Sequence, residues 1–136
     1  KDDTYNDTKG LPKAILDRLD HFLTLENDWD GAGGFPISPA AIEKTKIVLQ
    51  KSLDIPNNKE GVLPFISPSP EGGIGLEWYP ILGKELMISI SPDDNTPLTF
   101  LFDKPTSTGG ILESEGTIRD SHTLDDLLNY LFDKNY

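Results

Sequence analysis

The sequence predicts an α+β fold with two N-terminal helices, an antiparallel meander of four or five strands, and a C-terminal helix. In residues 74–79 and 85–90, every second side chain is large and apolar, which is typical of strands with a single buried face. A helical period of apolar residues is found only before residue 56 and after residue 122. Helices that are segregated from an antiparallel sheet define the α+β class.

Two helices are expected before the sheet. Over residues 11–25, an apolar stripe that includes Leu19, Phe22 and Leu23 has the helical period. A glycine-rich segment then predicts a loop. The second helix is expected to begin after Ser38, a favourable N-cap residue, and to end before Pro56.

The strands are expected between residues 62 and 119, and turn clusters separate them. The first, over residues 62–67, is interrupted by Pro64, which indicates an edge strand or a bulge. The last is expected to break near Gly116. A capping box over residues 123–126 then predicts the start of the C-terminal helix. The strand segments, in order, are 62–67, 73–79, 85–91, 98–103 and 111–119.

The length of 136 residues is that of one domain with a sizeable core. Residues 1–10 are polar and aperiodic, so we expect a flexible arm there and a single α+β domain over residues 11–136. The absence of cysteine excludes disulfides, zinc–thiolate sites and thiol nucleophiles, and it favours a cytoplasmic location. No apolar run approaches the roughly 20 residues that span a bilayer, so we expect no membrane association.

The charge is strongly negative. Twenty-three acidic against twelve basic residues give a formal net charge of −11. A surface of this sign repels nucleic-acid backbones and anionic lipids, and it attracts basic proteins. We therefore expect a basic protein partner and no direct contact with nucleic acid, although acidity that only maintains solubility is an alternative.

The segment from Glu26 to Gly31 places acids at alternate positions, as calcium-binding loops do. The twelfth position of such a loop requires a bidentate acid, but here it is Ile37. Asp28 and Asp30 are therefore expected to cap backbone amides of the loop, with a non-standard cation site or partner binding as alternatives. The glycines that follow lack the Lys-Ser/Thr pair of a phosphate-binding loop.

The second candidate site is on the predicted sheet. Glu77 is expected on the face opposite Leu76, where Glu85 or Met87 would lie near it. Paired carboxylates across a sheet can support hydrolysis, but acids on exposed strands usually form a solvated surface. Tyr79 is an aromatic residue in acidic surroundings, which is typical of a binding hot spot and also of a half-buried strand residue.

The remaining reactive residue types form no recognisable site. His21 and His122 are far apart in the sequence, and neither belongs to a motif with metal-ligand spacing. No serine occurs in a nucleophile motif. We therefore predict no catalytic residue, no metal site and no cofactor.

Three segments together resemble a pattern found in small bacterial proteins of no established activity. The first, over residues 29–38, fits W-D-G-x-G-x-x-P-I-S. The second, over residues 67–78, fits S-P-x-x-x-G-G-x-x-L-E-W, and an alternating strand follows at 85–90. The similarity covers about residues 25–91. It implies a shared core of helix, loop, helix and two strands, and it implies no activity.

These observations favour a non-catalytic binding protein of the antitoxin, immunity-protein or inhibitor kind, which captures a basic protein. Its expected contact residues are Asp28, Asp30, Glu77 and Tyr79. One alternative is a carboxylate-based or metal-assisted hydrolase that uses the loop acids or Glu77. Another is a structural subunit of a phage or a larger assembly, in which the edge strand at residues 62–67 pairs with another chain.

Overall fold

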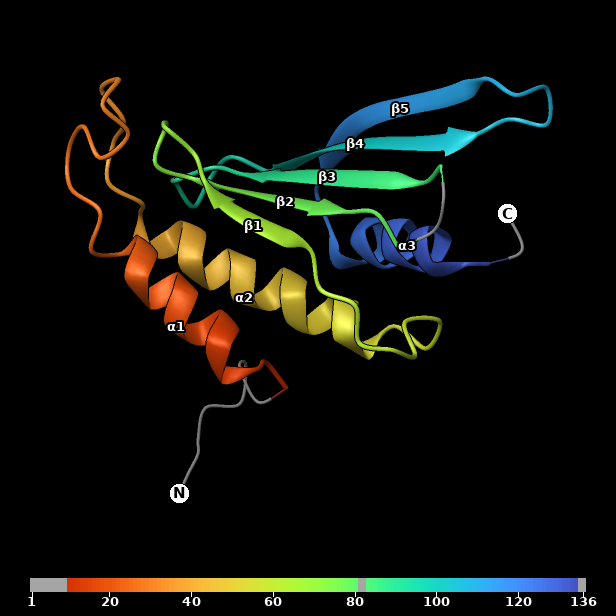
Figure 1. Cartoon of the computed structure of the whole chain (residues 1–136), viewed down its shortest axis with the longest axis horizontal. Coiled ribbons are helices and arrows are strands. Elements are labelled where there is room, and N and C mark those ends of the chain that lie inside the picture. Colours follow the sequence, from red (N-terminus) through yellow and green to blue (C-terminus); the bar gives the residue numbers. More distant parts are fainter. Residues whose placement is uncertain (1–9, 81–82, 135–136) are drawn as a thin grey trace.

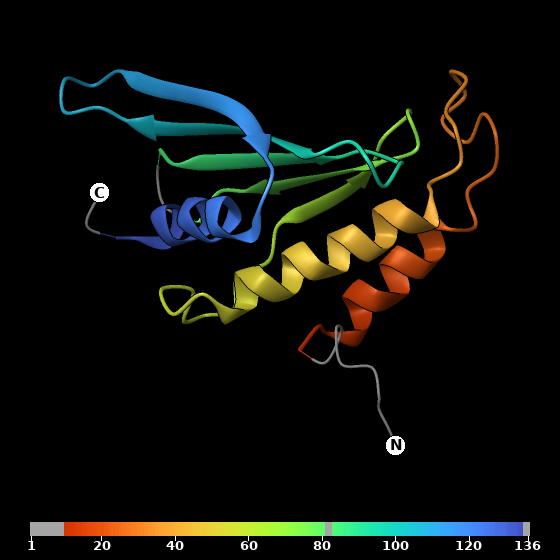
Figure 2. The ribbon, with the colours of Figure 1, turned by 180° about the vertical axis from the view of Figure 1, so that it is seen from behind.

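The computed structural model describes residues 10–80 and 83–134. Its helices lie on one side of an antiparallel sheet, and no described helix covers the other side (Figures 1 and 2). The predicted α+β class is therefore confirmed. The predicted arm, apart from Gly10, lies outside the described residues. The elements in chain order are α1 (Lys13–Phe22), α2 (Pro39–Asp54), β1 (Phe65–Pro68), β2 (Ile74–Trp78), β3 (Glu85–Ile90), β4 (Leu98–Pro105), β5 (Ile111–Ile118) and α3 (Ser121–Phe132).

Helix α1 is shorter than the predicted segment of residues 11–25. Pro12 precedes it in an extended conformation, and the chain leaves the helix at Leu23. Leu19 and Phe22 are buried as predicted, but Leu23 is 44% exposed. The prediction for Leu23 is wrong because the apolar period continues beyond the point where the helix ends.

The start of α2 is confirmed, whereas the start of α3 is corrected. Ser38 Oγ accepts a hydrogen bond from the Ala41 amide at 3.0 Å, as an N-cap residue does. At α3 the N-cap is Asp120, and its Oδ1 accepts the Thr123 amide at 2.8 Å. The helix therefore begins before the capping box predicted over residues 123–126.

The described strands pair in chain order, β1-β2-β3-β4-β5, and each is antiparallel to the next. This is the predicted meander, with five strands. Strand β1 begins at Phe65, after Pro64, and not at residue 62. Strand β5 continues through Gly116, where a break was expected. Gly116 pairs with Phe100, and a Cβ on it would lie 3.1 Å from the Phe100 ring, so glycine leaves room for that ring.

Side chains at every second strand position point toward the helices and form the core. The helices contribute residues such as Leu19, Leu49 and Leu128, and burial of such a side chain stabilises the fold by about 1.5–3 kcal/mol. The side chains of even-numbered strand residues thus point toward the helices, and those of odd-numbered residues point to the opposite side of the sheet. The buried strand residues are Ile66, Ile74, Leu76, Trp78, Leu86, Ile88, Ile90, Phe102 and Ile118.

The two sequence motifs meet at one end of the sheet. The Phe35 amide donates to the Pro70 carbonyl at 2.8 Å, and the Ser38 amide donates to the Gly72 carbonyl at 2.9 Å. Gly73 lies so close to β3 that a Cβ would come within 2.0 Å of the Ile90 carbonyl oxygen. Glycine is therefore required at that position, and the motifs build a joint between the loop before α2 and the β1–β2 turn.

Candidate functional site

The side of the sheet without helices carries five carboxylates, which we call the acidic face. Glu77 comes from β2, Glu85 from β3, Asp103 from β4, and Glu113 and Glu115 from β5. None of the described strand positions that face this way holds lysine or arginine. Five of the 23 acidic residues of the chain therefore share one surface that the helices leave open, with no basic residue among the described strand positions on it.

Three of these acids are in direct register across three strands. Glu85 pairs with Asp103, and Asp103 pairs with Glu113. Cross-strand partners have their Cβ atoms about 5 Å apart, and like charges at such positions destabilise a sheet. Moreover, Asp103 Oδ1 is buried and has no hydrogen-bond partner among the described residues. We therefore expect this acid row to lower the stability of the isolated protein.

A second row of the acidic face combines charge with apolar surface. Met87 and Leu101 are cross-strand partners, and Glu77 and Glu115 flank them on β2 and β5. Both apolar side chains are half-buried and reach the surface between the acids. The face can thus contact the aliphatic stem of a long basic side chain as well as its charged end.

An aromatic corner, formed by Phe65, Glu77 and Tyr79, borders the acidic face at β1. The Tyr79 hydroxyl donates to Glu77 Oε2 at 2.8 Å. This hydrogen bond, together with partial burial and the charges of Glu77 and Glu85, raises the pKa of Tyr79 to about 12. The Phe65 and Tyr79 rings pack edge to face, with centroids 6.4 Å apart, beside a shallow cavity of about 240 Å³. Because both rings are more than half exposed, they are available to a partner.

Asp28 and Asp30 are engaged within their own loop. Asp28 Oδ1 accepts the Gly33 amide at 2.7 Å, and Asp30 Oδ1 accepts the amides of Ala32 and Gly34 at 3.0 and 2.8 Å. These backbone hydrogen bonds lower the pKa of Asp30. The carboxylates therefore cap loop amides, as expected. A contact with a partner remains a prediction for both.

The structure does not bring all four predicted contact residues together. The loop that holds Asp28 and Asp30 leads into the joint at the β1–β2 turn, next to Gly72. Tyr79 follows the opposite end of β2, about 20 Å from that turn at the rise of an extended strand. Glu77 and Tyr79 thus form one group at the acidic face, and the loop aspartates form another.

Sequence reasoning missed three of the five acids. Asp103, Glu113 and Glu115 were not singled out, because strand positions reveal a shared face only when the register between strands is known. The available signal was local alternation in residues 111–118, which places both glutamates on one side of a strand.

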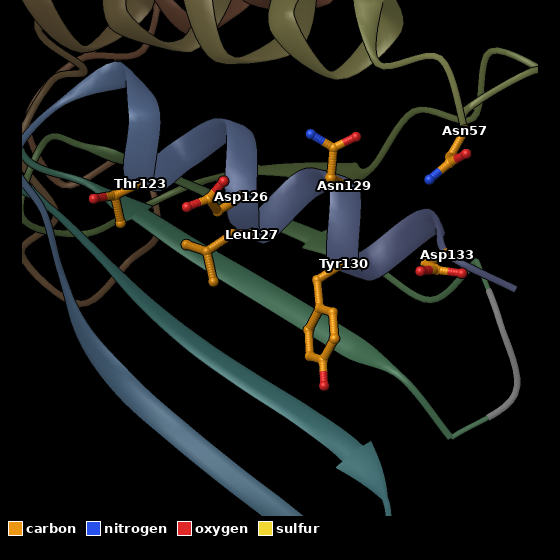
Figure 3. A pocket seen from close by; sticks show the side chains of 7 residues that line it. All are labelled: Asn57, Thr123, Asp126, Leu127, Asn129, Tyr130 and Asp133. Carbon is orange, nitrogen blue, oxygen red and sulfur yellow. The ribbon is translucent and has the colours of Figure 1, made fainter. Parts of the chain in front are cut away.

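A larger pocket, of about 510 Å³, lies along α3 (Figure 3). Figure 3 shows Tyr130 pointing from α3 toward the strands, whereas Asn57 approaches from the loop after α2. Lys84, which is only 2% exposed, donates to the carbonyls of Tyr130, at 2.9 Å, and Asp133. Burial lowers the pKa of this lysine. Lys84 thus holds the end of α3 against the sheet, and no carboxylate of the acidic face lines the pocket.

Among residues 10–80 and 83–134, no group of three or more histidine, cysteine or acidic side chains is arranged to hold a metal ion. In the same ranges, no helix has the length and apolar character needed to cross a membrane. Comparisons of the chain with protein-family models, curated proteins and solved structures give no match. The geometry of the acidic face and the aromatic corner is thus the basis for a functional proposal.

Proposed function

We propose that the protein is a non-catalytic acidic binding protein that captures a basic protein partner on its acidic face. The observation that carries this proposal is the acid row of Glu85, Asp103 and Glu113. Three like charges in register oppose folding, and a buried carboxylate oxygen without a hydrogen bond adds to this cost. Lysine or arginine side chains of a partner would offset both.

The net charge of −11 supports capture of such a partner. Complementary charges accelerate association and make it sensitive to salt, because the screening length at physiological ionic strength is about 8 Å. An antitoxin, an immunity protein or an inhibitor would benefit from both properties, since each must find its target quickly. The cysteine-free composition favours the cytoplasm as the place of capture.

The aromatic corner would supply affinity beyond charge. Tyrosine is enriched among residues that dominate interface energies, and aromatic side chains lose little conformational entropy on binding. Tyr79 is already held by Glu77 and by the Phe65 ring, so its orientation requires little further ordering. We therefore expect Tyr79 to be the hot spot, with Glu77 and the acid row around it.

The first experiment is an affinity pull-down from cells of the source organism at low salt, repeated at high salt. One basic protein retained at low salt and released at high salt supports the proposal and identifies the partner. If no basic protein is retained specifically, the proposal fails.

Two matched triple variants then test whether the position of the charges matters. The first neutralises the acid row with Glu85→Gln, Asp103→Asn and Glu113→Gln. The second removes the same charge from exposed acids elsewhere and consists of Glu26→Gln, Glu60→Gln and Asp94→Asn. We expect the first variant to lose the partner and the second to keep it. Equal loss in both would show that net charge, and not this face, attracts the partner.

A carboxylate-based or metal-assisted hydrolase is one alternative. General acid catalysis requires a carboxyl group whose pKa is raised toward neutrality. The pKa values of Asp30, Asp93 and Asp120 are lowered, because backbone or side-chain hydrogen bonds stabilise the charged form, so these three carboxylates are poor general acids. The in-register acid row favours binding over this alternative.

A further inference from the structure

Strand β5 forms one edge of the sheet, and its outer side pairs with no described strand. All of its residues except Ile118 are exposed, including Ile111 and Leu112. The β4–β5 hairpin also projects beyond the helices (Figures 1 and 2). An unpaired edge of eight residues presents a row of backbone donors and acceptors to any chain that approaches it.

The hairpin geometry identifies which residues carry these outward groups. The Thr106 amide donates to the Gly110 carbonyl at 2.9 Å, so these two residues form a hydrogen-bonded pair. Hydrogen-bonded and non-hydrogen-bonded pairs alternate along an antiparallel ladder, so the next pair, Pro105 with Ile111, is not hydrogen-bonded. Proline has no amide hydrogen and fits such a position. The outward amide and carbonyl groups of β5 therefore belong to its odd-numbered residues: Ile111, Glu113, Glu115 and Thr117.

The opposite edge of the sheet is protected in ways that β5 is not. Strand β1 has only four residues, and Pro64 and Pro68 stand before it and at its end. Short strands and prolines are the usual means of blocking unwanted pairing at an edge. Strand β5 is twice as long and contains neither proline nor lysine. The two edges therefore differ, and β5 is the one that can accept another strand.

We propose that β5 is the docking edge for an extended basic segment of the partner, which adds to the sheet as a further strand. This inference rests on the proposed function and specifies how one segment of the partner binds at the β5 edge of the acidic face, while the aromatic corner lies at the opposite edge. Glu113 and Glu115 offer alternating carboxylates on the acidic face, so the added strand carries lysine or arginine at every second position. A second copy of this chain does not fit, because its own Glu113 and Glu115 would lie beside these acids, and each copy carries a net charge of −11.

The test uses a synthetic ten-residue peptide in which lysine alternates with threonine. Its binding to the isotope-labelled protein is followed by amide chemical shifts and by affinity at low salt. We expect the largest shifts, and new protection from hydrogen exchange, at residues 111–118. Two N-methylated versions of the peptide, one methylated at the lysine amides and one at the threonine amides, keep every charge. Because every second amide of an added strand faces β5, one of the two versions cannot donate to β5, and we expect that version to bind at least tenfold more weakly.

Two protein variants separate edge pairing from charge attraction. Thr117→Pro removes one outward amide and keeps all carboxylates, and proline is tolerated where the amide of an edge strand faces solvent. This variant is expected to bind the unmethylated peptide severalfold more weakly, without a change in the salt dependence of that binding. Glu115→Gln keeps the amide and is expected to reduce the salt dependence instead.

Three outcomes would overturn the inference. If both methylated versions bind as tightly as the unmethylated peptide, with shifts spread over β2, β3 and β4, edge pairing is wrong while capture by charge stands. If Thr117→Pro leaves the affinity of the unmethylated peptide unchanged, the outward amide has no role. If no peptide binds at low salt while the pull-down still retains a basic protein, the partner binds elsewhere.

Discussion

Replacement of Asp103 by asparagine is expected to stabilise the protein in the absence of its partner. Asp103 lies between two carboxylates, with Glu85 opposite it on β3 and Glu113 opposite it on β5. Each like-charge cross-strand pair costs roughly 0.2–1 kcal/mol. Removal of the central charge relieves both pairs, so we expect the free energy of unfolding to rise by about 1 kcal/mol. For a chain of this size, that corresponds to a rise in Tm of about 4 °C.

The assay is urea and thermal unfolding of Asp103→Asn and of the wild-type protein at low salt and at about 1 M salt. The screening length falls to about 3 Å at that concentration, less than the spacing of the acid row, so the stabilisation should shrink. Asp94→Asn is the control, because Asp94 is an exposed turn residue outside the acid row. Asp103→Asn should also weaken binding of the partner, since it removes the central charge of the proposed contact.

Two results would refute this reasoning. If Asp103→Asn is no more stable than Asp94→Asn at low salt, the row does not strain the sheet. If the gain is the same at both salt concentrations, its origin is not repulsion between charges.

Three further changes test other parts of the structure. Glu77→Gln should return the pKa of Tyr79 from about 12 toward 10, as followed by ultraviolet titration of the phenolate. Since folding raises this pKa, the contribution of Tyr79 to stability is present below pH 10 and is lost as the pH rises through 12. Gly73→Ala should destabilise the fold by about 1–3 kcal/mol or prevent folding, because its methyl group would strike the Ile90 carbonyl; an unchanged urea midpoint would contradict this. Ser38→Ala should cost about 1 kcal/mol through loss of the α2 cap, again measured by urea unfolding.

The sequence predicted those features that depend on local period. Alternation around Leu76 and Ile88 places both residues on one face, and the structure buries both. The N-cap at Ser38 is equally local, because it needs only a hydroxyl and a following helix. The residues at which helices and strands begin and end follow less directly from the local period. The N-cap of α3 is Asp120 and not Thr123, because the Asp120 carboxylate accepts a hydrogen bond from the Thr123 amide.

The acid row could not be predicted in the same way. Glu85 and Asp103 are separated by the β3–β4 turn, and the length of that turn alone does not determine which residues pair. A shift of one residue in register would send Asp103 to the opposite face. The candidate site therefore depends on strand pairing, whereas the expected role of Asp28 and Asp30 could be read from the loop itself.

The joint between the loop before α2 and the β1–β2 turn has a consequence for recognising relatives. The motif residues that build it, such as Ser38 and Gly73, are used for architecture. Three of the five carboxylates of the acidic face lie on β4 and β5, beyond the segment that the motifs cover. A search with these motifs would therefore select for the frame and would leave the sequences of β4 and β5 unconstrained. Comparison of such proteins should begin with those two strands.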